Sequence, residues 1–100
     1  MDKLSVAKAK ELRGEIIKNL YVCYDHPILI SNIHNLLRYK NYNSKDDIKK
    51  AFQYLAGIKK EFIQITINED NYMTSLVQLT PMGINLAEGD ITDMGVILYG

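Results

Sequence analysis

The pattern that decides the fold is residues 62–81, FIQITINEDNYMTSLVQLTP. Every second residue from Ile63 to Ile67 is isoleucine, which is typical of a half-buried β-strand. The polar run 68–71 predicts a turn, and residues 72–79 are extended again. Two strands joined by four turn residues predict a β-hairpin.

A helix is predicted directly after the hairpin. Thr80 is a favourable N-cap, and Pro81 suits the first helical position, where the missing N–H needs no partner. Gly89 closes this helix, because glycine readily adopts the left-handed conformation found at helix ends. Residues 90–100 then form a tail whose last part, Met94–Gly100, is apolar and uncharged.

Two helices and a short strand are predicted at the start of the chain. Residues 4–24 carry apolar side chains at helical spacing. Gly14 is unfavourable inside a helix and indicates a bend, which would make residues 1–12 an N-terminal arm. A small strand at 28–30 follows, and Ser31 is the expected N-cap of the second helix. The expected apolar face of that helix is Ile33, Leu36 and Leu37.

Ser44 opens a third helix as its N-cap, and Gly57 lies near its end. The side chains expected to face the core are Ile48, Ala51, Phe52, Leu55 and Ile58. The order of elements is that of a winged helix-turn-helix, an α+β fold with a three-helix core, a wing of two or three strands and an extra C-terminal helix. Residues 1–100 form one such domain. Because this motif presents its second helix to the DNA major groove, residues 45–57 are the predicted recognition helix.

The expected outer face of the recognition helix offers groups that bind DNA. Lys49 and Lys50 would contact phosphates, and Gln53 can make a bidentate contact to adenine. Backbone N–H groups at the helix N-terminus favour an anion. The candidate DNA-binding residues are Asn43, Ser44, Lys45, Lys49, Lys50, Gln53 and Tyr54. The alternative is a solvated helix surface with ordinary solubilising lysines.

The charge distribution supports an anionic partner. Residues 1–60 contain all twelve basic residues and six acidic ones, a net charge of +6, whereas residues 61–100 contain six acidic residues and a net charge of −6. Such asymmetry indicates a basic surface that meets an anion, most often nucleic acid, here double-stranded DNA. The alternative is that solvated, lysine-rich helices happen to come first in the chain, which would give the same difference in net charge.

Two acidic features oppose this interpretation. Asp46 lies where the recognition helix would enter the groove, and the expected wing tip contains Glu69 and Asp70. A wing that enters a minor groove needs cations, because phosphate neutralisation supplies much of the affinity. The second hypothesis is therefore a winged-helix protein–protein interaction module that does not bind DNA.

No residue pattern indicates an enzyme. Cys23, His26 and His34 do not match a zinc spacing, and we expect no metal, no cofactor and no small-molecule substrate. Cys23 is expected in the core and His34 on the surface. No apolar run is long enough to span a membrane, no secretory leader is evident, and a single cysteine favours a reducing cytoplasm. The long first helix and the apolar tail, an aggregation hazard if free, predict a homodimer.

Residues 79–89, LTPMGINLAEG, and residues 93–96, DMGV, resemble the C-terminal signature of small winged-helix proteins encoded in Mu-like prophages. That signature is a Leu-Thr-x-x-Gly-Ile-x-Leu-x-Glu-Gly run followed by Asp-x-Gly-Ile/Val. The family often has proline where this chain has Met94. The resemblance is architectural over residues 12–78. It implies a phage or prophage origin, a winged-helix fold and a role as a transcriptional regulator, and it supplies no binding residues.

Overall fold

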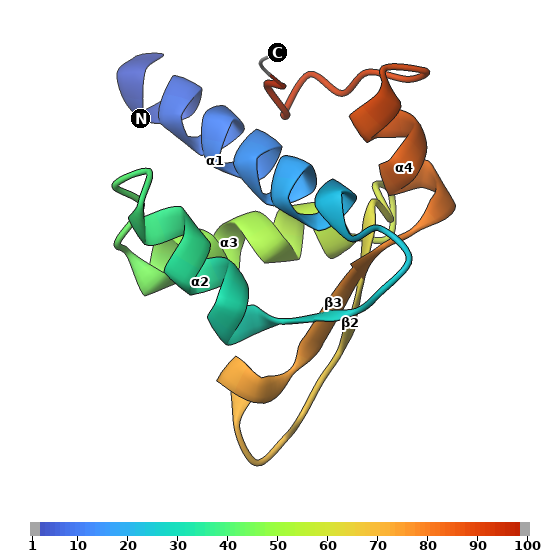
Figure 1. Ribbon diagram of the computed structural model, residues 1–100. Helices are drawn as coiled ribbons and strands as arrows, with labels where there is room; N and C mark the ends of the chain where they lie inside the picture. Colours follow the sequence, from blue (N-terminus) through green and yellow to red (C-terminus); the bar gives the residue numbers. More distant parts are fainter. Residues whose placement is uncertain (1–2, 99–100) are drawn as a thin grey trace.

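The first helix, α1 (Lys3–Val22), crosses the molecule and packs on the other helices and the sheet (Figure 1). Its buried apolar residues are Leu12, Ile16, Ile17 and Leu20. The helix is continuous through Gly14, and residues 3–12 of the predicted arm belong to α1. The computed structural model describes residues 3–98, and residues 1–2 of the arm lie outside that range.

The strand β1 (Ile28–Leu29) leads directly into α2 (Ile30–Arg38). The expected N-cap, Ser31, is wrong, because α2 begins at Ile30, so Ser31 lies inside the helix, and no side chain caps it. The amide of Ile30 instead donates a hydrogen bond to the carbonyl oxygen of Ser75, at 2.9 Å. This bond to the hairpin therefore satisfies the first backbone N–H of α2, where a side-chain cap would otherwise be expected to satisfy one of the first amides.

The third helix, α3 (Lys45–Ala56), is confirmed. The Ser44 hydroxyl caps it by accepting a hydrogen bond from the Asp47 amide, at 3.2 Å. Its buried residues are Ile48, Ala51, Phe52 and Leu55, as expected. The expectation that Ile58 continues this stripe is wrong, because the helix ends before Gly57 and Ile58 is 90% exposed.

Three antiparallel strands form a sheet in the order β1-β3-β2, with β2 at Ile63–Thr66 and β3 at Leu76–Leu79. The hairpin is confirmed, but its predicted four-residue turn is wrong. Residues 67–75 connect β2 to β3 and contain a 3₁₀ turn, η1 (Tyr72–Thr74). The Asn71 side chain caps this turn by accepting from the Met73 amide, so local polar bonds replace the expected strand.

The helix after the hairpin, α4 (Pro81–Glu88), is confirmed together with its caps. The Thr80 hydroxyl accepts a hydrogen bond from the Gly83 amide and donates one to the carbonyl oxygen of Glu61. Gly89 has φ of 83°, the left-handed conformation that glycine adopts without strain.

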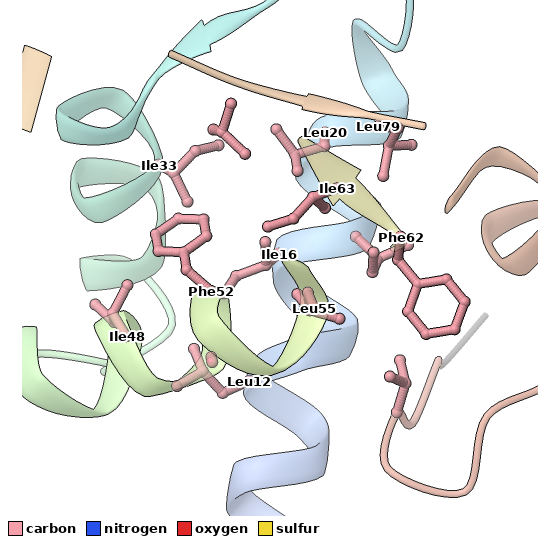
Figure 2. Close-up of a cluster of buried hydrophobic side chains, with 14 of the residues drawn as sticks. Leu12, Ile16, Leu20, Ile33, Ile48, Phe52, Leu55, Phe62, Ile63 and Leu79 are labelled. Atoms are coloured by element: carbon pink, nitrogen blue, oxygen red, sulfur yellow. The ribbon is translucent and has the colours of Figure 1, made fainter. Parts of the chain in front are cut away.

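One hydrophobic core joins the helices to the sheet, with the Phe52 ring of α3 fully buried in it (Figure 2). Two sequence expectations about this core are wrong. Cys23 is exposed, and His34 is buried at 4% exposure. The face that α2 buries runs from Ile30 through His34 to Leu37, at helical spacing. This rotation leaves Leu36 45% exposed.

Burial of His34 should make the protein less stable in mild acid. Desolvation of the ring, with the nearby charges of Lys45 and Arg38, lowers its pKa below 6.5. The unfolded chain binds a proton as the pH falls below 6.5 while the folded chain does not, so stability declines until the lowered pKa is reached. We expect a loss of up to about 1.4 kcal/mol per pH unit in that window, measured by urea denaturation.

The substitution His34→Leu should remove this pH dependence, because it takes away the buried base. The matched control is His26→Gln, since His26 is an exposed histidine. An unchanged slope in the His34→Leu variant would contradict the assignment.

Candidate nucleic-acid interface

The side of α3 opposite Phe52 is open to solvent. Burial of every third or fourth residue fixes the rotation of the helix, so the residues between them point outward. We call this surface the exposed face of α3; it consists of Lys45, Asp46, Lys49, Lys50 and Gln53, all of which are exposed. The structure thus brings together four of the seven candidate DNA-binding residues.

Two more candidates, Asn43 and Ser44, lie at the N-terminal end of this face. Both are exposed in the turn between α2 and α3. This turn contains Asn41 at φ of 67°, a left-handed conformation that asparagine tolerates better than most residues. The turn therefore leaves the first backbone amides of α3 next to polar, accessible side chains.

Both lysines at the centre of the face have partners. Lys50 Nζ lies 3.2 Å from Asp46 Oδ2, one helical turn earlier, and both side chains are at least 70% exposed. Lys49 Nζ lies 5.3 Å from the ring centroid of Tyr72 in η1. Exposed ion pairs of this kind contribute little to stability. A phosphate could therefore replace Asp46 as the partner of Lys50, although the Asp46 carboxylate would then lie unpaired beside that phosphate.

The seventh candidate, Tyr54, does not share this surface. Its ring is half-buried, and the Arg13 guanidinium lies 3.9 Å from the ring centroid. Its hydroxyl donates a hydrogen bond to Asp93 Oδ2 at 2.6 Å. The ring thus connects α3 to the chain's own tail, and its DNA contact stays a sequence prediction that this geometry does not favour.

The tail, residues 90–98, packs on the molecule instead of standing free. Val96 is buried, and the Ile97 amide donates to the carbonyl oxygen of Lys10 at 3.1 Å. Arg13 Nη1 donates to the carbonyl oxygen of Gly95 at 2.9 Å. The premise of a free apolar tail is therefore wrong for these residues, while Tyr99 and Gly100 lie outside the described range.

Asp93 is the polar centre of the tail. Its carboxylate accepts hydrogen bonds from Tyr54, from Lys60 Nζ at 2.7 Å and from the Gly95 amide at 3.0 Å. Burial raises the pKa of this carboxyl, but the bonds from Lys60, Tyr54 and Gly95 together lower it by more, so the pKa lies below 3.8. Asp93 is therefore ionised near neutral pH and holds the tail against α3.

The wing is held by hydrogen bonds within its connection and is acidic at its tip. Asn68 organises the connection, since its amide donates to Ser75 Oγ and its side-chain Nδ2 donates to Thr74 Oγ1. Glu69 and Asp70 are exposed, and residues 61–100 contain no Lys or Arg. Figure 1 shows this tip at the end of the hairpin remote from α1. The wing offers no cation to a phosphate.

Within residues 3–98, no three His, Cys, Asp or Glu side chains gather in a way that could hold a metal ion. None of the described helices is both long and apolar enough to cross a membrane.

Comparison with known proteins identifies the architecture. No family model matches the sequence, and no curated protein matches it either. Among solved structures, the chain is similar to a mutant of MepR from a multidrug-resistant S. aureus clinical isolate, with a TM-score of 0.61 and 18% identity. The fold is a winged helix. The match covers 77% of this chain and 51% of the MepR chain, so the protein spans about half the length of MepR.

Proposed function

We propose that the protein is a DNA-binding transcriptional regulator that places α3 in the major groove. The observation that carries this proposal is the exposed face of α3, where Lys45, Lys49, Lys50 and Gln53 are all open to solvent. In a winged helix this helix is the second of the helix-turn-helix, the one that reads base edges. The fold likeness to MepR, a winged-helix regulator, supports the same geometry.

Each group on the face has a distinct role in the proposal. Lys49 and Lys50 neutralise phosphates and supply affinity without sequence preference. Gln53 reads adenine through its amide, which both donates and accepts. Asn43, Ser44 and Lys45 place polar groups beside the α3 N-terminus, where backbone amides favour a phosphate.

A phage or mobile-element origin and a homodimer complete the proposal. The origin rests on the resemblance of residues 79–89 and 93–96 to the prophage proteins. The dimer rests on the long α1, since the packed tail no longer argues for it. Two copies would set two recognition helices about 34 Å apart, on successive turns of the major groove.

The double substitution Lys49→Gln/Lys50→Gln should weaken DNA binding about tenfold or more at moderate salt. Loss of two phosphate contacts should also reduce the slope of log affinity against log salt by about 1.8. The measurement is fluorescence anisotropy with a labelled random-sequence duplex, titrated at several salt concentrations.

The matched control is Lys18→Gln/Lys59→Gln, which removes the same charge from exposed positions outside the face. The control should bind nearly as tightly as the unmodified protein. Equal affinity and equal salt slope for the two double variants would refute the proposed face.

A winged-helix interaction module is the second candidate, and the exposed acids Glu69 and Asp70 at the wing tip favour it. Selection from random DNA separates the two. Enrichment of a sequence supports the regulator, and an empty selection with no retention on heparin supports the module.

A further inference from the structure

A second basic surface adjoins the exposed face of α3. A cleft of roughly 670 Å³, partly open to solvent, lies between α1, the α2–α3 turn and the first two turns of α3. Leu12, Ile48 and Ala51 are part of its lining and are buried core residues, so the cleft is closed on the side of the hydrophobic core. No local sequence pattern indicates this cleft, because its walls come from segments some thirty residues apart.

The rim of the cleft is cationic. Lys8, Arg13, Lys40 and Lys50 line it against two acids, Glu11 and Asp47. Arg13 is held by Gly95 and Tyr54, and Lys50 is paired with Asp46. Lys8 and Lys40 are exposed and make no ion pair or side-chain hydrogen bond within the described part of the chain. These two lysines are available to an external anion.

The cleft and the exposed face share one end of α3. Lys50, in the second turn of α3, lines the cleft, and so does Ser44, the N-cap of the same helix. Lys50 thus belongs both to the lining of the cleft and to the exposed face of α3, so the two basic surfaces adjoin. An open cleft with lysines at its edges suits a polyanion that lies across it, whereas small-molecule sites are usually enclosed and apolar.

We propose that Lys8 and Lys40 hold the sugar–phosphate backbone of the same duplex that α3 reads. This inference rests on the proposed function and adds a contact outside the recognition helix. The contact fixes the register of the protein on the duplex and carries no sequence information, because phosphates are alike at every step. It also supplies the flanking cations that the acidic wing lacks.

The test uses the full chain with the double substitution Lys8→Gln/Lys40→Gln and a fluorescein-labelled random-sequence duplex. Loss of two phosphate contacts should reduce the salt slope by about 1.8 and weaken binding several-fold at moderate salt. The Lys8→Arg/Lys40→Arg variant should bind like the unmodified protein, since arginine keeps the charge. A duplex enriched by selection should lose the same factor as the random duplex.

The control pair Lys18→Gln/Lys59→Gln removes the same charge elsewhere and should leave the slope unchanged. If Lys8→Gln/Lys40→Gln matches this control while Lys49→Gln/Lys50→Gln loses binding, the cleft contact is wrong and the proposed function stands. If the unmodified protein binds no duplex, both proposals fall.

Discussion

The substitution Gly14→Ala should detach the tail from α1 and lower the free energy of unfolding by about 3 kcal/mol. In an exposed helix interior, alanine stabilises relative to glycine by about 1 kcal/mol. Here the sign reverses, because a Cβ on residue 14 would overlap the carbonyl oxygen of Ile97. Backbone cannot move aside as a flexible side chain can, so the tail must leave or α1 must shift.

Two measurements check this result. Urea denaturation gives the change in stability, and amide hydrogen exchange at Ile97 reports the bond to the Lys10 carbonyl directly. The matched control is Gly57→Ala, where the nearest atom to a new Cβ is a carbonyl oxygen 3.3 Å away and a small effect is expected. Retained protection at Ile97 with raised stability in Gly14→Ala would contradict the packing.

The substitution Asp93→Ala should lower the free energy of unfolding by about 2 kcal/mol and release the tail beyond Thr92. It leaves the Tyr54 hydroxyl and the Gly95 amide without the acceptor that both now use. Asp93→Asn is the matched variant, since it keeps the shape and one acceptor oxygen, and its effect should be smaller. Equal stability of Asp93→Ala and the unmodified protein would show that the carboxylate does not hold the tail.

The pH dependence of this contact follows from the lowered pKa of Asp93. Its contribution is fully present above the ordinary value of 3.8 and is lost as the pH falls through the lower pKa of the folded state. The buried His34 begins to lower the stability at about pH 6.5, whereas Asp93 keeps its charge down to a pH below 3.8. The tail should therefore remain docked in the pH range in which His34 weakens the core. Exchange at Ile97 measured at pH 5 separates the two effects.

Local chemistry made much of the fold predictable. Ser44 and Thr80 cap their helices through their own hydroxyls, and Gly89 supplies a left-handed residue, so each signal acts within a few residues of itself. The period of three and four residues in α3 was sufficient to identify its outer face, including Lys49 and Lys50.

Long-range contacts account for the failures. Ser31 is no cap because a hairpin carbonyl serves α2 instead, and Gly14 lies inside a continuous helix at a point where a side chain would overlap the tail. His34 faces the core because Ile30, Ile33 and Leu37 dictate the rotation of α2, although histidine is more polar than Leu36. Tyr54 turns toward Asp93, a residue far along the chain. No local pattern encodes such pairings.

Ser75 joins the hairpin to the helical layer. It is fully buried, its carbonyl oxygen receives the first amide of α2, and its hydroxyl receives the amide of Asn68 in the wing. Ser75 therefore ties the position of the hairpin to the start of α2, the first helix of the helix-turn-helix. The hairpin thus helps to position the helices, although it contains no Lys or Arg that could contact DNA.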